Sequence, residues 1–486
     1  MRGNANDSGG YRGAALRILN DAGASVGDTI TIATRQEGIA HVGIVMPRYE
    51  HGDETHIVLK LKSGYNVGVD IRTIRGVATT PGGGRRADGG GKVLSSPSSL
   101  PSSSSPGQSS RDTDSTTTAG RAPKGGAKRI LLLSTGGTIA SRIDYRTGAV
   151  TPVLSADDLL EAVPELGGMA AIDSEVVTSE YSENIMPEHW LRLARRIAER
   201  AGPAAARAGA SGGGGGGRRY NGIIVAHGTD TMHYTSAFLS FALAGLPTPI
   251  VLVGAQRSSD RASSDAAANL AGAARFITSC GRRGVYVAMH RGPDDDVIAC
   301  HAGTRVRKNH TSRRDAFQTV GGDPAFLVSP DGITETGGGG GRPDFYGGAA
   351  YSPRIHLDER VALVKYYPGY DPGLLDHMID AGCRAIIFEG TGLGHVGRAV
   401  YRQVARAADS GIFLGMTSQC IDGRIAMTVY ESGRDLMGMG VVALGNMIPE
   451  VALVKAMWAA GVDTDVTAEG IREAMLSNIA SEVTAH

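Results

Sequence analysis

Residues 129–141 read RILLLSTGGTIAS, so a short apolar run passes directly into a turn rich in glycine and threonine. Residues 222–232 repeat this arrangement as GIIVAHGTDTM. A short apolar run bounded by glycine and polar residues is typical of a strand buried on both faces of a parallel sheet. Ligands bind beside the carboxyl ends of such strands. We therefore expect both turns at one functional edge of a sheet.

Further runs of the same kind follow along the chain, at residues 249–254, 285–289, 361–364, 385–388 and 412–415. Segments with helical periodicity separate several of these runs, at residues 187–200, 265–277, 396–409 and 449–460. Pro187 suits the first turn of the first of these helices. Buried strands alternating with helices predict an α/β fold with a mostly parallel sheet. The stretch that begins near residue 361 predicts a second, smaller α/β unit.

The first 78 residues have a different pattern. Short alternating segments over residues 27–36, 41–50, 56–64 and 65–71 predict strands that pack as a small β-barrel or barrel-like sheet. Residues 79–127 are rich in glycine, serine and proline, and cannot bury enough apolar area to offset their chain entropy. We predict a β-rich domain over 1–78, a disordered linker over 79–127, and α/β domains over 128–355 and 356–486.

The bulk composition excludes several classes of protein. A formal net charge of zero over 486 residues gives no overall attraction to nucleic acid or to a membrane. The N-terminus is polar, and no apolar run approaches the roughly 18 residues that a membrane-spanning helix needs. The four cysteines are far apart and have no metal-ligand spacing: Cys280, Cys300, Cys383 and Cys420. These features predict a cytoplasmic protein with reduced thiols and no metal.

The turn at Ser134–Ser141 contains hydroxyl groups that could act as nucleophiles. Gly136 and Gly137 allow the backbone to turn sharply and bring amide groups close to a substrate. A hydroxyl such as that of Thr135 needs a base to remove its proton. The alternative is a strand-to-helix turn in which the threonines only cap the helix.

The second turn places Gly228, Thr229 and Asp230 at the same predicted edge. A carboxylate beside a hydroxyl can manage its proton or bind a substrate ammonium group. The alternative is that Asp230 only caps the following helix.

Lys308 lies in a basic stretch, AGTRVRKNHTSRRDAFQT. In a desolvated site near Thr229 and Asp230, a lysine can serve as a base. Two alternatives remain open at this level, because the stretch could equally form a solvated basic face or a small RNA-contacting patch.

Several motifs together resemble a known family. STGGTIAS (134–141) and VAHGTDTM (225–232) are similar to the two signature motifs of bacterial-type L-asparaginases and glutaminases. The likeness extends over roughly residues 128–480. GAQRSSDRASSDAA (254–267), RIDYRTGAV (142–150) and the N-terminal strands resemble most closely the D subunits of archaeal glutamyl-tRNA(Gln) amidotransferases, whose extra domain ordinary asparaginases lack.

This resemblance implies a fold and a set of catalytic residues. The expected fold is an asparaginase-like large parallel-sheet domain, a smaller C-terminal α/β domain, and a β-barrel-like N-terminal domain. The family nucleophile corresponds to Thr135, its second-motif pair to Thr229 and Asp230, its lysine to Lys308, and its mobile-loop tyrosine to Tyr145.

The resemblance also implies substrate-binding groups. The family's substrate-binding serine corresponds to Ser182, with Glu183 beside it. Backbone amides around Gly136 and Gly137 and the turn at Gly228 and Thr229 are the candidates to stabilise an oxyanion.

The implied activity is that of a glutaminase subunit, which hydrolyses glutamine and supplies ammonia for converting Glu-tRNA(Gln) to Gln-tRNA(Gln). The resemblance implies a partner, the E subunit of the amidotransferase, that binds ATP and Mg²⁺, and a homodimer of this chain within a heterotetramer. The chain itself has no P-loop and no expected cofactor. The alternatives are a stand-alone cytoplasmic L-asparaginase and an inactive asparaginase-fold scaffold or RNA-binding module.

Overall fold

The computed structural model describes residues 10–35, 40–46, 54–61, 66–79, 128–136, 141–143, 150–152, 163, 165–202, 220–257, 264–293, 297–337, 351–463 and 465–484. The chain forms two compact units, one of Met1–Arg121 with Ile143–Val150 and one of Ala122–Arg142 with Thr151–His486. Residues 80–127, which make up nearly all of the predicted linker, lie outside the described residues. None of the helices in the described ranges is long and apolar enough to span a bilayer.

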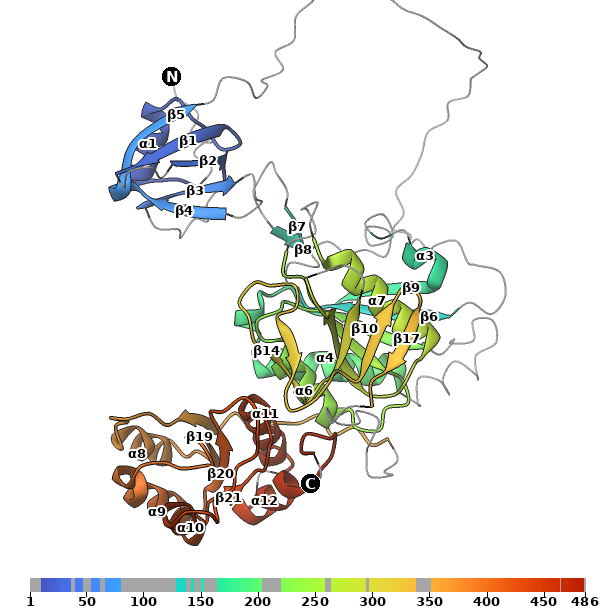
Figure 1. Cartoon of the computed structure of the whole chain (residues 1–486), viewed down its shortest axis with the longest axis vertical. Coiled ribbons are helices and arrows are strands. Elements are labelled where there is room, and N and C mark those ends of the chain that lie inside the picture. The colour runs from blue at the N-terminus through green and yellow to red at the C-terminus, as the bar shows by residue number, and fades with distance from the viewer. Residues whose placement is uncertain are drawn as a thin grey trace, which may run out of the picture. The chain divides into compact units, whose positions relative to one another are not determined.

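The N-terminal unit is an antiparallel sheet packed against one helix (Figure 1). Its strands lie in the order β4-β3-β2-β1-β5, and α1 (Gly13–Asp21) buries Ala15 and Leu19. The strands are β1 (Thr29–Thr34), β2 (Ala40–Val45), β3 (His56–Leu61), β4 (Asn66–Asp70) and β5 (Ile74–Thr79), with a 3-10 turn η1 (Ile71–Thr73) before β5. The first four were predicted from their alternation, whereas α1 and β5 were not.

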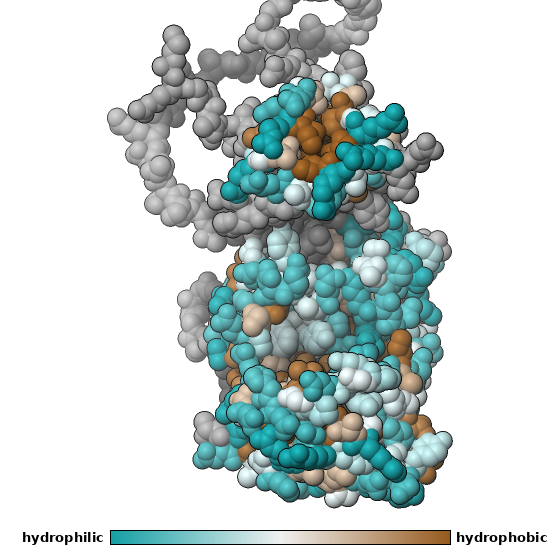
Figure 2. Space-filling view, turned by 90° about the vertical axis from the view of Figure 1, so that its left-hand side faces the viewer, coloured by the Kyte–Doolittle hydropathy of each residue, from teal (hydrophilic) through white to brown (hydrophobic). Residues whose placement is uncertain are grey.

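The apolar residues of this unit alternate between the two faces of the sheet. Ile30 and Ile32 on β1, and Ile57 and Leu59 on β3, are fully buried in the core. On the opposite face, Val42 and Ile44 of β2 remain exposed, and Figure 2 shows a gathering of apolar side chains on the surface of this unit. Because successive side chains of a strand point to opposite faces, the alternation of apolar and polar residues in the sequence predicts these strands.

The larger unit consists of an N-terminal lobe and a C-terminal lobe. The N-terminal lobe is built on an eight-stranded sheet in the order β17-β16-β13-β12-β11-β10-β6-β9. Strands β9, β6, β10, β11 and β12 are mutually parallel, and β13, β16 and β17 continue the sheet in antiparallel fashion. These strands are β6 (Arg129–Ser134), β9 (Ala171–Val176), β10 (Gly222–Ala226), β11 (Ile250–Val253), β12 (Val285–His290), β13 (Ile298–Ala302), β16 (Phe326–Ser329) and β17 (Gly332–Glu335).

Helices cover both faces of this sheet. Leu131 and Leu133 of β6 pack in the same cluster as residues of α4 (Pro187–Ala201) and α6 (Met232–Ala242). Ile130 and Leu132 face the opposite cluster, with α7 (Ala266–Ser279) and α3 (Glu165–Met169). Strands buried on both faces have no alternation of polar residues, which explains the continuous apolar runs in the sequence.

The C-terminal lobe has a smaller parallel sheet in the order β18-β19-β20-β21. Its strands are β18 (Val361–Lys365), β19 (Ala385–Gly390), β20 (Phe413–Ser418) and β21 (Val442–Ala443). Helices α8 (Gly373–Asp380), α9 (Tyr401–Asp409) and α10 (Glu431–Gly438) share one cluster, while α11 (Pro449–Ala460) and α12 (Ala468–Leu476) pack in the cluster that also contains α4 and α6. The last cluster therefore joins the two lobes.

Short elements complete the description of the larger unit. A hairpin of β14 (Val306–Lys308) and β15 (Phe317–Thr319) follows β13. Ser182–Asn184 and Arg398–Val400 form the 3-10 turns η3 and η4. Strands β7 (Ser141–Ile143) and β8 (Val150–Pro152) form a separate two-stranded sheet.

Candidate active site

The two signature turns lie at the same edge of the large sheet, because β6 and β10 are adjacent parallel strands whose last residues, Ser134 and Ala226, are partners in register. Thr135 directly follows β6 and is buried. Its backbone N–H donates to Ala226 O at 3.0 Å, and its hydroxyl donates to the same oxygen at 3.1 Å. The first turn is thus attached to the end of the neighbouring strand.

Gly136 turns the chain after Thr135. Its φ of +105° is a conformation that residues with a side chain rarely adopt. A Cβ atom here would lie 2.3 Å from the carbonyl oxygen of Glu180. Glycine is therefore required both by the backbone conformation and by the close approach of the chain segment that leads to Ser182. Gly137 lies outside the described residues.

Thr229 and Asp230 follow β10, and Lys308 reaches them from the hairpin. Lys308 Nζ donates to Thr229 Oγ1 at 2.8 Å and to Asp230 Oδ1 at 2.6 Å. The Lys308 side chain is only 9% exposed, whereas that of Asp230 is 64% exposed. The structure therefore brings a hydroxyl, a carboxylate and an amine together from segments about 80 positions apart in the chain.

Ser182 joins the same group from η3. Its hydroxyl lies 3.4 Å from Asp230 Oδ2 and 3.3 Å from the Asp230 backbone nitrogen, which donates to it. The Ser182 carbonyl accepts a hydrogen bond from the Thr231 hydroxyl at 2.6 Å. Glu183 follows in the same turn with an exposed side chain, and Tyr145 lies outside the described residues.

Gly228 permits this contact. A Cβ atom at position 228 would lie 2.7 Å from Ser182 Cβ and 2.9 Å from Ser182 Oγ. Only glycine lets the second turn approach Ser182 so closely.

The first part of the basic stretch around Lys308 is not a solvated face. Arg305 is fully buried and donates to backbone carbonyls of Asn446 and Val320. Arg307 forms an ion pair with Glu450, and Arg313 with Asp315. Arg305, Arg307 and Lys308 are therefore engaged within the protein, whereas Arg313 remains 56% exposed.

A histidine that sequence reasoning left without a role supports the second turn. His227 is buried, with Nδ1 2.6 Å from Gly228 O and Nε2 2.9 Å from Thr235 Oγ1. Because a carbonyl only accepts, Nδ1 carries the proton and donates it, and Nε2 accepts from the threonine hydroxyl. Burial lowers the pKa of His227 to about 4, so the ring is neutral near pH 7.

A second buried network holds the loop after β11, beside Thr229. The Asp265 carboxylate accepts from the backbone N–H groups of Gln256 and Arg257, each at 3.0 Å. Asn269 donates to Asp265 at 3.1 Å and to Gly254 O at 3.0 Å, and its side-chain oxygen lies 2.6 Å from His290 Nδ1. The spacing of Asp265 and Asn269 on one helix face is visible in the sequence, but their partners lie in the chain that follows β11 and at the end of β12.

Family models match most of the chain. The model described as Asparaginase, N-terminal matches residues 129–211 and 214–334, and that of the Glutaminase/Asparaginase C-terminal domain matches residues 360–475. The GatD N-terminal domain matches residues 24–78.

Relatives of similar length match nearly the whole chain. A protein from Methanopyrus kandleri, named as the D subunit of glutamyl-tRNA(Gln) amidotransferase, is 40% identical over 476 residues, covering 97% of this chain and 94% of the relative. A protein of the same name from Pyrococcus abyssi is 38% identical over 471 residues, covering 96% of this chain and 97% of the relative. The chain belongs to the family of glutamyl-tRNA(Gln) amidotransferase D subunits.

Solved structures with the same fold are L-asparaginases. The thermostable L-asparaginase of Thermococcus kodakarensis is 32% identical with a TM-score of 0.61, and the match covers 74% of this chain and all of that one. The probable cytoplasmic L-asparaginase of Campylobacter jejuni is 25% identical with a TM-score of 0.56, covering 72% of this chain and 99% of that one. These matches confirm the predicted asparaginase-like fold. About a quarter of this D-subunit family member has no counterpart in the two asparaginases.

Proposed function

We propose that the chain is the glutaminase subunit of a tRNA-dependent amidotransferase. It hydrolyses the side-chain amide of glutamine, and a partner, the E subunit, uses the ammonia to convert Glu-tRNA(Gln) to Gln-tRNA(Gln). The observation that carries the proposal is the convergence of Lys308, Thr229 and Asp230 beside Thr135 at one sheet edge. The names of the relatives supply the tRNA-dependent reaction.

In the proposed reaction, the Thr135 oxygen attacks the amide carbon of glutamine. The carbon–nitrogen bond then breaks, and ammonia leaves with the proton that the threonine gave up. Water hydrolyses the resulting ester, which releases glutamate and restores the hydroxyl. Tyr145, which the family resemblance implies as the mobile-loop tyrosine, is the group expected to help activate Thr135. Among the described residues, the Thr135 hydroxyl donates to the Ala226 carbonyl.

Lys308, Thr229 and Asp230 are proposed to manage protons during these steps. Thr229 Oγ1 accepts from Lys308, so its own proton remains free to be donated to a reacting atom. Asp230 fixes the lysine through its first oxygen. Its second oxygen and Ser182 Oγ, 3.4 Å apart, are placed to receive the polar end of the substrate.

The tetrahedral intermediate needs donors for its oxyanion. The Gly136 N–H is one candidate. Its hydrogen bond to Ser134 Oγ is long, at 3.4 Å, so an oxyanion could replace the serine as its acceptor. Gly137, Gly228 and Thr229 supply the other candidate backbone amides. A single such donor is typically worth about 2.7–4 kcal/mol in the transition state.

The N-terminal sheet favours this function over that of a stand-alone asparaginase. The solved asparaginases match about three quarters of the chain, and the domain matched over residues 24–78 is described as that of GatD. The scaffold alternative is disfavoured, because every expected catalytic residue type is present in the sequence. Three of these residues, Thr229, Asp230 and Lys308, are in contact, and the substrate-binding candidate Ser182 contacts Asp230.

Amide hydrolysis by the purified chain tests the proposal, with glutamine or asparagine, and with or without the partner subunit, ATP, Mg²⁺ and Glu-tRNA(Gln). Glutamine hydrolysis that is strongest in the full complex is expected. Rapid turnover of free asparagine by the chain alone would instead identify an asparaginase, and absence of turnover under every condition would identify a scaffold. Lys308→Ala should lose most of the activity in the same assay.

A further inference from the structure

Lys308 lies on a strand whose neighbouring side chains contact the C-terminal lobe. Successive side chains of an extended strand point to opposite sides. Lys308 contacts Thr229 and Asp230 of the N-terminal lobe, while Arg307 contacts Glu450 of the C-terminal lobe. Arg305, two positions before Arg307, also contacts the C-terminal lobe. The strand therefore links the candidate active site to the other lobe.

Arg305 holds the start of this strand. Its Nη1 donates to Asn446 O at 2.8 Å and to Glu482 O at 3.1 Å, and its Nη2 donates to Val320 O at 2.7 Å. The side chain is fully buried, and its planar guanidinium group is fixed by three carbonyls. Two of these carbonyls belong to the C-terminal lobe, so the strand cannot shift without that lobe.

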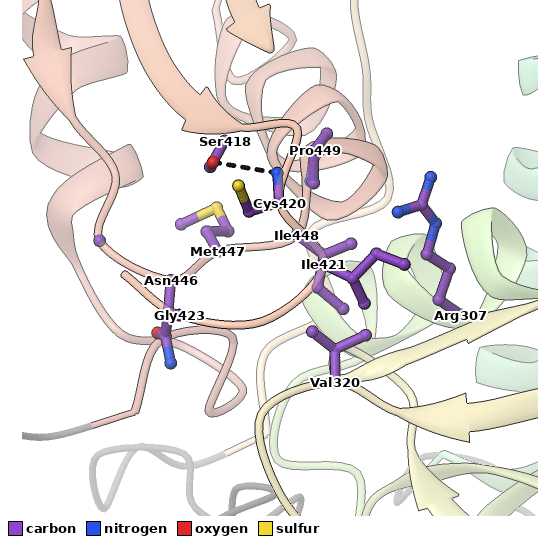
Figure 3. Close-up of a pocket in the computed structure, with 11 residues that line it drawn as sticks. Arg307, Val320, Ser418, Cys420, Ile421, Gly423, Asn446, Met447, Ile448 and Pro449 are labelled. Atoms are coloured by element: carbon purple, nitrogen blue, oxygen red, sulfur yellow. Dashed lines mark hydrogen bonds between the residues drawn. The ribbon is translucent and has the colours of Figure 1, made fainter. Parts of the chain in front are cut away.

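Arg307 forms the second connection, next to Lys308. Its Nε lies 2.9 Å from Glu450 Oε1, and the two side chains are 26% and 9% exposed. Figure 3 shows Arg307 and Val320 of the hairpin region facing Ile421, Ile448 and Pro449 across a pocket between the lobes. Pro449 and Glu450 begin α11, so the ion pair joins the hairpin to the first turn of a buried helix.

The buried surroundings of Glu450 mean that its negative charge depends on the nearby positive charge of Arg307. Burial raises the pKa of Glu450, the positive charge of Arg307 opposes the rise, and Glu389 adds to it. Among the described residues, Glu450 Oε2 is buried without a hydrogen-bond partner. A buried carboxylate with only one satisfied oxygen is costly unless a cation is beside it, so Glu450 and Arg307 hold each other in place.

We infer that Glu450 is a positioning residue for amide hydrolysis, acting through Arg307 on Lys308. The first turn of α11 sets where the hairpin lies, and the hairpin sets whether the Lys308 amine reaches Thr229. This inference rests on the proposed function. Because the link from Glu450 to the site runs through Arg307 and the strand, its effect should appear in the chemical step rather than in substrate binding.

The test measures glutamine hydrolysis by the full complex that contains Glu450→Gln, Glu450→Asp or Arg307→Lys. Glu450→Gln keeps the side-chain shape but removes the charge that holds Arg307. A displacement of Lys308 by about 1 Å is expected to lower kcat by about 10- to 100-fold. KM should change little, and Glu450→Asp should recover part of the loss because it keeps the charge.

Asp358→Asn is the matched control. Asp358 forms ion pairs with Arg360 and Arg384 in the same lobe, and none of these residues belongs to the hairpin. The control should lower the free energy of unfolding without lowering kcat, which separates positioning from general stability.

Two results would overturn the inference. The first applies when the wild-type complex is active: the Glu450→Gln and Arg307→Lys complexes both keep kcat within about twofold of the wild-type value. That change is well short of the loss expected for a displaced amine. The other is an equal loss of kcat in Glu450→Gln and Asp358→Asn, which would indicate a structural role only. Failure of the proposed function is distinguishable, because the wild-type complex would then hydrolyse no amide. If Glu450→Gln does not fold, Glu450→Asp and Arg307→Lys decide the question alone.

Discussion

Thr135 and Thr229 occupy similar positions after adjacent parallel strands, yet their hydroxyl groups have different partners. The Thr135 hydroxyl donates to the Ala226 carbonyl, whereas that of Thr229 accepts from the Lys308 amine. The two threonines are therefore suited to different tasks. Thr135 is expected to form the covalent bond, and Thr229 to pass protons to and from Lys308.

Replacing Thr135 by alanine tests this division of roles. The substitution removes one hydrogen bond, worth about 1 kcal/mol of stability. It should nevertheless lower kcat for glutamine by about 10⁴- to 10⁶-fold, because no nucleophile remains. Steady-state hydrolysis measures the loss, and Thr135→Ser should restore part of the activity. An active Thr135→Ala protein together with an inactive Thr229→Ala protein would transfer the nucleophile to Thr229.

Gly228→Ala should change substrate binding more than chemistry. The added Cβ would lie 2.7 Å from Ser182 Cβ, so Ser182 must move away from Asp230. We expect KM for glutamine to rise by about tenfold with a smaller change in kcat, because a displaced binding group misplaces the substrate. Gly438→Ala is the control, since a Cβ there meets nothing within 4 Å. Equal kinetics in both variants would contradict the role assigned to Ser182.

At the scale of elements, α11 and the chain after α12 are joined by a fully buried ion pair. Lys455 of α11 and Glu482 both have fully buried side chains. Lys455 also donates to Met475 O at 3.0 Å, and Glu482 accepts from the backbone N–H groups of Ile479 and Ala480 at 3.0 and 2.7 Å. Each charge is thus satisfied by its partner and by the ends of neighbouring segments.

Removing one member of this pair should destabilise the larger unit strongly. Lys455→Met leaves Glu482 buried without its cation, and a loss of about 3–5 kcal/mol in the free energy of unfolding is expected. Lys455→Met combined with Glu482→Leu should recover part of the loss, because no uncompensated charge remains. Urea unfolding measures both. The coupling would be contradicted if the double variant lost as much free energy of unfolding as the two single variants lose together.

At the scale of the whole molecule, three of the buried histidines in the described part of the chain have strongly lowered pKa values, which makes stability depend on pH. Burial lowers the pKa of His227 and of His233 to about 4, and that of His301 to about 3. In the unfolded chain these rings take up a proton near pH 6.5. The unfolded state therefore binds more protons between these values, and acidification favours unfolding.

We expect the free energy of unfolding to fall as pH drops from about 6.5 toward 4, by about 1.4 kcal/mol per pH unit for each such histidine. Denaturant unfolding at several pH values measures this slope. His301→Gln should reduce it by the share of one histidine, whereas His377→Gln, at an exposed position, should leave it unchanged. An unchanged slope in His301→Gln would show that His301 takes up its proton in the folded state.

Much of this protein was determined by local sequence. Continuous apolar runs predicted the central parallel strands β6, β10, β11 and β12, because strands covered on both faces need no polar alternation. Alternation predicted the first four strands of the N-terminal unit for the opposite reason. The two turns rich in glycine and threonine predicted the functional edge of the sheet. A tight turn depends on a few consecutive residues, so the sequence alone reveals it.

Tertiary structure alone decided how distant segments meet. The antiparallel strands β13, β16 and β17 were not predicted from the sequence, and their pairing within the sheet identifies them. The spacing of charges around Lys308 does not distinguish the lysine that reaches Thr229 from the arginines that bind the C-terminal lobe, and only the family resemblance singled out Lys308. The side on which each side chain lies is set by the hairpin and by the packing of the two lobes, and these long-range contacts are not encoded in any single segment.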